Sequence, residues 1–221
     1  MALTEEMVLR AQRQDDDRWH VGNQVLYNLC RDYPEHVDDA TIVAKVWLIG
    51  RAYSASIERG RPKGLSNDRF YTEAVPNEMR KQKHRLDDNL KALAELKEVD
   101  DESSIAKMLE THGHLVRCFK KLTTLSKRSL ASKYLHFHLP NLFFIYDSRA
   151  ASSIRSLPGG RHTVPSPPTA DPEYAKFVGA ALGVREHVSS EFGERLSPRQ
   201  LDRLLLATFA SAAVPLTQPP R

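Results

Sequence analysis

Residues 125–150 read LSKRSLASKYLHFHLPNLFFIYDSRA, and the fold prediction starts from this stretch. Four apolar or small residues follow the three- and four-residue spacing of a helix with one buried face: Leu130, Ala131, Tyr134 and Leu135. Pro140 ends that helix, because proline has no amide to donate and restricts the residue before it. The apolar run 142–146 then leads to Asp147, which we predict caps a further helix.

The same helical periodicity recurs along the rest of the chain, usually after a residue that favours a helix start. Further helices are expected to begin at Thr4, 38–39, Pro76, 100–103, Asp171 and Ser197. In the helix after residue 39, the positions predicted to face the core are Ile42, Val43, Val46, Trp47 and Ile49. No convincing strand pattern appears. We therefore predict an all-α fold of about eight to nine helices.

The chain has 221 residues, a length that favours one domain or two small lobes sharing a core. We expect a single all-α domain over residues 1–213, with two lobes on either side of a cleft. Residues 157–170, rich in proline and glycine, are predicted to be a long irregular connection. Residues 214–221 carry three prolines and are predicted to be a frayed tail.

The composition is that of a soluble globular protein, with 41% hydrophobic and 27% charged residues. No apolar run is long enough to span a membrane, and the first residues lack a signal-peptide pattern. Cys30 and Cys118 lie in helical patterns and resemble small buried side chains rather than a disulfide framework. We expect an intracellular, reducing, cytoplasmic location, associated with the nucleoid if the source is bacterial.

The positive charge is concentrated in one stretch, although the net charge is only +4. Between residues 117 and 133 there are six basic residues and no acid: Arg117, Lys120, Lys121, Lys127, Arg128 and Lys133. Such a one-sided stretch favours a polyanionic partner. The alternative is a solvated face, which is the commoner fate of a charge run.

Asp147 is the first candidate for chemistry. A carboxylate fixed at a helix start is stabilised in its ionised form and can face a developing positive charge. Cleavage of an N-glycosidic bond passes through an oxocarbenium-like sugar, which carries such a charge. The alternative is an ordinary aspartate cap, which is the more frequent role.

Several of these residues resemble the helix-hairpin-helix superfamily of DNA glycosylases. Arg128-Ser129, Ala131 and Leu135 match its helix after the hairpin, and the FIYD run 144–147 matches its apolar segment and catalytic aspartate. Uncharacterised proteins similar to 8-oxoguanine glycosylase carry a comparable ASKYL…P…YDS string. The resemblance covers about 25 residues and implies base excision from duplex DNA, a DNA-repair hydrolase activity.

The resemblance also assigns catalytic roles. Asp147 takes the place of the catalytic aspartate, and Ser129 fills the position that holds Ser in adenine-glycosylase-type members and Lys in bifunctional members. Ser129 therefore favours water as the nucleophile. Lys133, one helical turn further on, is the nearby amine that can form a Schiff base if one forms at all. The alternative for Lys133 is a surface or salt-bridged lysine.

The chain departs from the family at the hairpin, where residues 125–127 read LSK instead of Gly-hydrophobic-Gly. We expect the Lys127 and Arg128 side chains to take over the phosphate contact from the missing glycine amides. Arg51 and Tyr53 are expected to line a pocket or stack on an extruded base, with a structural arginine and a core tyrosine as the alternative. The full set of expected DNA-binding residues is Lys127, Arg128, Arg149, Lys120, Lys121, Arg51, Tyr53, Arg61 and Lys63.

No metal or cofactor is expected. Two histidine pairs, His112 with His114 and His136 with His138, are each spaced by two residues, so on a helix their rings point apart. Two distant cysteines also cannot supply the ligands of an iron–sulfur cluster.

Two other function classes stay open at this point. The missing hairpin glycines favour a catalytically inactive nucleic-acid-binding helical module. Arg31 and His36 match the Arg-x4-His spacing of all-α toxin or defence ribonucleases, although Pro34 interrupts the helix on which that chemistry depends.

Overall fold

A computed structural model of the protein describes residues 2–13 and 20–213. These residues contain helices and no strand, so the all-α prediction is confirmed. The expected tail, residues 214–221, lies outside the described residues. The elements are α1 Glu5–Gln12, α2 His20–Asp32, α3 Asp39–Ala52, η1 Ile57–Gly60, α4 Asn67–Arg69, the π-helical η2 Phe70–Ala74, α5 Val75–Ala94, α6 Glu102–Thr123, α7 Arg128–His138, α8 Ser148–Ser153, η3 Ile154–Ser156, α9 Pro172–Phe192 and α10 Pro198–Ala213.

Side-chain caps explain why the helices begin where they do. Asp38 accepts a hydrogen bond from the Thr41 amide at 2.8 Å, which satisfies one of the amides left free at the start of α3. Asp101 begins α6 in the same way, through a reciprocal capping box with Ser104. The helix starts expected at Thr4, 38–39, 100–103 and Asp171 are confirmed.

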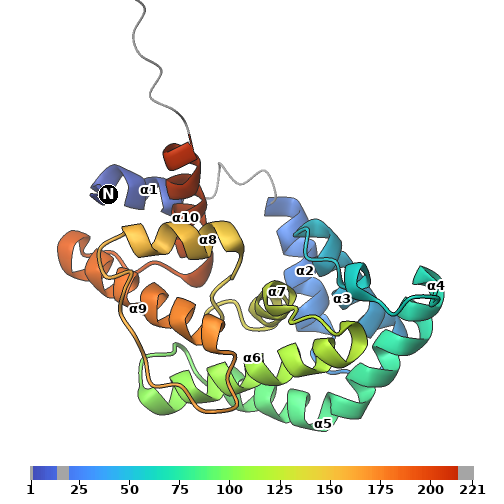
Figure 1. The fold of residues 1–221 in the computed structure, drawn as a ribbon. Coiled ribbons are helices and arrows are strands. Elements are labelled where there is room, and N and C mark those ends of the chain that lie inside the picture. The colour runs from blue at the N-terminus through green and yellow to red at the C-terminus, as the bar shows by residue number, and fades with distance from the viewer. Residues whose placement is uncertain (1, 14–19, 214–221) are drawn as a thin grey trace, which may run out of the picture.

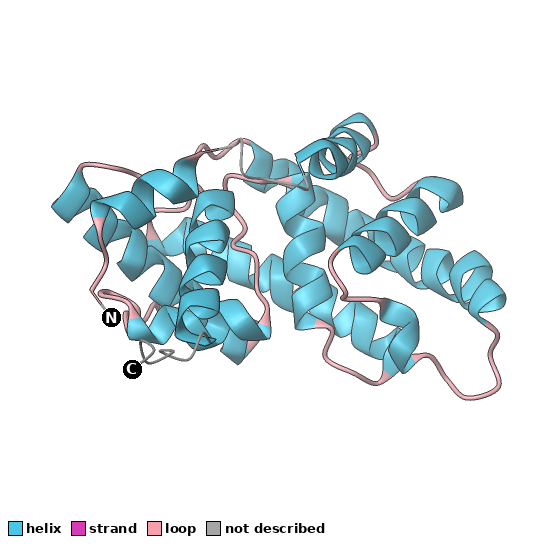
Figure 2. Ribbon diagram, turned by 90° about the horizontal axis from the view of Figure 1, so that it is seen from above, coloured by secondary structure: helices cyan, strands magenta, loops and turns pink. Residues whose placement is uncertain are grey.

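Helix α7 lies at the centre of the molecule. In Figure 1, α1, α8, α9 and α10 gather on the left and α2, α3 and α4 on the right, with α5 and α6 along the bottom and α7 seen end-on in the middle. Figure 2 shows the same two groups from above. Helices α2, α3 and α6 pack on α7, and α8 packs on α10. Every residue from Leu130 to Phe137 is buried, so any polar side chain on this part of α7 must find its partners inside the protein.

The core of α3 differs from the prediction at two positions. Trp47, expected inside, is 44% exposed, whereas Lys45 is fully buried. The Lys45 ammonium donates to the carbonyls of Tyr33 and Glu35, at 2.9 and 3.2 Å. Those two carbonyls satisfy the buried charge in part. Position 45 follows the three- and four-residue spacing of the buried positions 42, 46 and 49, whereas position 47 does not, so the helix turns tryptophan outward.

Residues 157–170 form the long connection without a helix of their own, apart from the turns within it. Glycines let this connection approach its neighbours closely. A Cβ on Gly183 of α9 would lie 2.3 Å from the Gly159 carbonyl, and one on Gly113 of α6 would lie 2.3 Å from the Thr169 carbonyl. The connection is therefore tightly packed against two helices. None of the described helices has the length and apolar character needed to cross a bilayer.

The left-handed residue of the turn between α6 and α7 is Thr124, directly before residues 125–127, where the resemblance places glycines. Thr124 caps α6 in the left-handed region, with φ 61° and ψ −4°, a conformation that favours glycine. The hairpin thus closes with the geometry of a glycine cap but without a glycine. Lys127 is the N-cap residue of α7, and its side chain makes no capping hydrogen bond to the first amides of that helix.

We predict that Thr124→Gly raises the free energy of unfolding by about 0.5–1 kcal/mol, because it removes the cost of a β-branched residue at positive φ. Urea unfolding followed by circular dichroism measures the change. Gly193, the left-handed cap of α9, is a matched control, because a Cβ added there would meet no heavy atom within 4 Å.

The control substitution Gly193→Thr is expected to lower the free energy of unfolding by about 1 kcal/mol, since only the backbone conformation opposes the new side chain. Changes of opposite sign at the two caps support this description of the hairpin. A destabilised Thr124→Gly variant would contradict it.

Candidate functional site

The apolar run before Asp147 is held by three hydrogen bonds, one to α9 and two to α7. The Tyr174 hydroxyl of α9 donates to the Phe144 carbonyl at 2.9 Å, and the Tyr146 amide donates to Ser132 Oγ at 3.0 Å. His136 of α7 contacts the Phe143 carbonyl through Nδ1, also at 2.9 Å. These contacts fix residues 142–146 against α7 and α9, and so they set the position of the residue that follows.

Asp147 is the N-cap of α8, as predicted. Its Oδ1 accepts a hydrogen bond from the Ala150 amide at 2.9 Å, and its side chain remains 19% exposed. The nearest cation is Arg149, whose Nη2 lies 3.8 Å from Asp147 Oδ2 and whose side chain is 60% exposed. One oxygen is thus used for the cap, while the carboxylate as a whole still reaches the surface.

Lys133 lies in the interior and contacts the residue that precedes Asp147. Its residue exposure is 2%, which excludes the surface lysine considered as an alternative. The ammonium donates to Ser129 Oγ at 2.6 Å and to the Tyr146 carbonyl at 3.2 Å. The expectation that Ser129 and Lys133 share one face of the helix is confirmed. Burial lowers the pKa of the Lys133 amine, and the Asp147 and Asp202 carboxylates oppose that shift.

Tyr53 and Arg199 complete the surroundings of Lys133. Lys133 Nζ lies 5.9 Å from the centroid of the Tyr53 ring, and Arg199 Cζ lies 5.5 Å from the same centroid. The Tyr53 hydroxyl donates to Asn23 Oδ1 on α2. Arg199 of α10 also donates twice to the Tyr27 hydroxyl, each time at 3.1 Å. Side chains from α2, α3, α7 and α10 therefore meet at one point.

Asp202 is the residue of this cluster that sequence reasoning missed. It lies on α10, is 6% exposed, and has Arg199 Nη1 at 3.6 Å from Oδ2. Burial raises its pKa to about 6, against the attraction of Arg199. Within the described residues, the buried Oδ1 has no hydrogen-bond partner. An acid next to the apolar stripe of the last helix was the one available signal.

Folding brings acids and carbonyls onto much of the basic stretch. Arg128 is held by both carboxylate oxygens of Asp171, with Nη2 2.9 Å from Oδ2. Lys121 lies 3.3 Å from a carboxylate oxygen of Glu78. The expectation that this stretch carries unopposed positive charge is therefore wrong at these two residues, because the opposing acids come from distant parts of the chain.

The other expected DNA-binding residues are spread over several elements. Lys127 donates to the Ser56 carbonyl at 3.0 Å, Arg51 pairs with Glu58 at 2.6 Å, and Arg61 Nε donates to the Leu65 carbonyl at 2.8 Å. Three expected residues are exposed and have no carboxylate oxygen closer than 3.8 Å in the described part of the chain: Lys63, Lys120 and Arg149. The expected cations come from α3, the loop after η1, α6, the start of α7 and α8, and of this set only Arg149 pairs with the catalytic candidate.

The histidines have separate partners. His112 stacks on Tyr174 with ring centroids 3.6 Å apart, and its Nε2 contacts the Arg128 carbonyl. His138 stacks on His36, 5.6 Å between centroids. Across residues 2–13 and 20–213, no three His, Cys, Asp or Glu side chains gather in a metal-binding cluster.

The residues of the possible ribonuclease motif do not offer an exposed acid–base pair. His36 is fully buried, with Asp87 Oδ1 at 2.5 Å from Nδ1 and the Tyr134 hydroxyl at 2.6 Å from Nε2. Arg31 is exposed and pairs with its neighbour Asp32 at 3.1 Å. Burial lowers the pKa of His36, so this imidazole serves the core rather than a polynucleotide.

No model of a protein family, no curated protein and no solved structure matches this chain. The functional inference therefore rests on the site itself.

The raised pKa of Asp202 predicts a pH-dependent stability. The carboxyl of Asp202 holds its proton more tightly in the folded than in the unfolded protein. Its stabilising contribution to the free energy of unfolding is therefore fully present at low pH. It is lost as the pH rises from the ordinary value of 3.8 through about 6. Relative to Asp202→Asn, the wild type should lose about 1 kcal/mol of unfolding free energy between roughly pH 5 and pH 7.5. Urea unfolding at the two pH values measures the difference.

Asp171→Asn is the matched control. Burial raises the pKa of Asp171, but the bonds from Arg128 and from the Tyr174 amide outweigh burial and leave the pKa below 3.8. Its stability contribution is therefore lost only on acidification below that value, and its difference from wild type should stay constant over the same range. A constant difference for Asp202→Asn would show that Asp202 is not held protonated by burial.

Proposed function

We propose that this protein excises a damaged or modified base from duplex DNA by cleaving its N-glycosidic bond, as helix-hairpin-helix DNA glycosylases do. The observation that carries the proposal is the hydrogen bond from the buried Lys133 ammonium to the carbonyl of Tyr146, the residue directly before Asp147. This bond places a buried amine, whose pKa burial lowers, next to the segment that ends in a partly exposed carboxylate at the head of α8. An amine and a carboxylate in that relation are the two groups that base excision with a covalent intermediate needs.

Asp147 supplies the electrostatic part of the reaction. As the bond between the sugar C1′ and the base nitrogen lengthens, positive charge builds up on the sugar ring. A carboxylate already fixed by the Ala150 amide needs no reorganisation to oppose that charge. The electron pair of the broken bond leaves with the base, which takes up a proton.

Lys133 supplies the nucleophile in this proposal. Burial favours the neutral amine, and the hydrogen bond to Ser129 Oγ holds its nitrogen in one place. The amine nitrogen forms a bond to C1′ as the base departs and loses a proton to solvent; ring opening then gives an imine. Ser129 positions the amine instead of replacing it, which revises the expectation that water is the nucleophile.

The DNA backbone is proposed to lie along the hairpin and the head of α8. The first amides of α7 receive no side-chain cap from Lys127 and can face a phosphate. Arg149 lies beside Asp147 and exposes 60% of its side chain, and Lys120 is exposed at the end of α6. These cations can hold phosphates on either side of the extruded nucleotide.

A second candidate function has one observation in its favour. The Lys133 ammonium is almost completely buried and already satisfied by Ser129 and the Tyr146 carbonyl. A protein that binds DNA without excision would tolerate that arrangement. Measuring excision and DNA binding on the same duplexes separates the two candidates.

We predict that Asp147→Asn lowers the rate of base excision by at least about 100-fold, as expected for removal of a charge that opposes the transition state. Asparagine still caps a helix, so folding and DNA affinity should change little. The measurement is strand cleavage after alkali, on a panel of duplex oligonucleotides that carry single modified bases, together with a mobility shift on the same duplexes.

Asp38→Asn is the matched control, because Asp38 caps α3 with the same geometry and lies outside the proposed site. It should excise at the wild-type rate. Binding without excision by the wild type on every duplex would favour the second candidate. An unchanged rate in Asp147→Asn would remove this carboxylate from the mechanism.

A further inference from the structure

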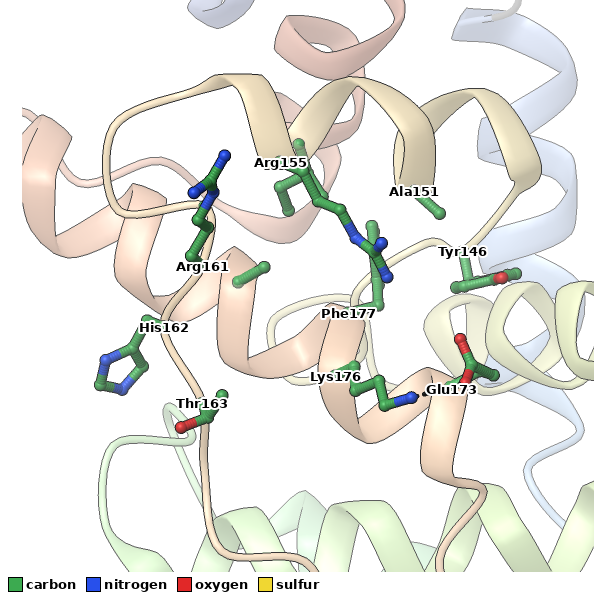
Figure 3. Close-up of a pocket in the computed structure, with 12 residues that line it drawn as sticks. Tyr146, Ala151, Arg155, Arg161, His162, Thr163, Glu173, Lys176 and Phe177 are labelled. Atoms are coloured by element: carbon green, nitrogen blue, oxygen red, sulfur yellow. Dashed lines mark hydrogen bonds and ion pairs between the residues drawn. The ribbon is translucent and has the colours of Figure 1, made fainter.

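A pocket lies between α8, the long connection and α9. Its volume is about 410 Å³, within the range of small-molecule sites. Figure 3 shows it from the side, with Tyr146 and Ala151 at one end and His162 at the other. It is lined by residues that the proposed excision does not use, apart from Tyr146, whose carbonyl accepts the Lys133 hydrogen bond.

The walls of this pocket are fixed by close backbone packing. A Cβ on Gly160 would lie 1.9 Å from the Ile154 carbonyl, and one on Gly179 would lie 2.7 Å from the His162 carbonyl. Side chains at these positions would push the connection away from η3 and α9. The glycines therefore build a preformed hollow, and a ligand entering it does not have to order the connection first.

The charge of the lining is positive. Arg155 and Arg161 are exposed, and neither has an ion-pair partner among the described residues. In Figure 3 the Arg155 side chain reaches from η3 toward Phe177. Lys176 adds a third cation, and the one acid in the lining, Glu173, pairs with it at 2.9 Å. Two guanidinium groups are left without an acid. Figure 3 shows them pointing in different directions, so an anion that binds both must draw these exposed side chains together.

The remaining lining is aromatic. The rings of Tyr146 and Phe177 meet edge to face, with centroids 5.2 Å apart and an interplanar angle of 82°. Aromatic side chains beside guanidinium groups without an ion pair suit a ligand with a planar ring at one end and a phosphate at the other. We propose that this pocket binds a nucleotide, with its phosphate on Arg155 and Arg161 and its base against Tyr146 and Phe177.

The nucleotide can come from two sources. Tyr146 directly precedes Asp147, so a nucleotide unit of a DNA strand held at the proposed excision site could reach the pocket. A free nucleoside monophosphate presents the same chemistry. The binding itself does not require excision.

Isothermal titration calorimetry on the full chain tests the proposal with three probes: dAMP, inorganic phosphate and a short single-stranded oligodeoxynucleotide. Arg155→Gln and Arg161→Gln should each weaken dAMP binding about tenfold, since each removes a charge-assisted hydrogen bond. Arg31→Gln removes the same charge from an exposed arginine on α2 and should have no effect. Circular dichroism confirms that the variants are folded.

Tighter binding of the oligonucleotide than of dAMP, with the same sensitivity to both arginines, assigns the pocket to a strand. Equal or weaker oligonucleotide binding assigns it to a free nucleotide. The proposal is overturned if dAMP does not bind or if the two pocket variants match Arg31→Gln. Inorganic phosphate binding as tightly as dAMP would also overturn it, since the rings would then contribute nothing.

Discussion

The Lys133 ammonium lies inside the protein because other helices cover α7, and two oxygens accept its hydrogen bonds there. Ser129 Oγ comes from the same helix and the Tyr146 carbonyl from the segment that delivers Asp147. This contact ties α7 to the head of α8. Without it, a buried cation would have too few partners, and Asp147 would have no fixed relation to an amine. The excision proposal depends on that relation.

The cluster around Lys133 joins the two groups of helices. Tyr53 caps the end of α3 and Asn23 belongs to α2, whereas Arg199 and Asp202 belong to α10. Burial lowers the pKa of the Lys133 amine and raises the pKa of the Asp202 carboxyl. The charges of these two groups oppose both shifts. Titratable groups shifted in opposite directions are typical of functional sites, although buried ion pairs in structural networks show the same behaviour.

Local features could be predicted from the sequence. The cap at Asp147 follows from an acid before a helix, and the contact between Ser129 and Lys133 follows from helical spacing. Features that depend on tertiary contacts could not. The sequence around Arg128 does not indicate its ion pair with Asp171, and the sequence around Tyr53 does not indicate its contact with Arg199. At residues 125–127 the sequence indicated an unusual hairpin, while the positive φ of the preceding Thr124 became apparent only in the structure.

Borohydride trapping on duplex DNA with an abasic site, followed by mass mapping of the modified peptide, tests whether Lys133 acts as the nucleophile. An imine between the Lys133 amine and the sugar aldehyde releases water when it forms, and borohydride reduces it to a stable adduct. The proposed chemistry predicts an adduct on Lys133 that is absent in Lys133→Gln and retained in Lys127→Gln. No adduct, or an adduct on another lysine, would contradict it.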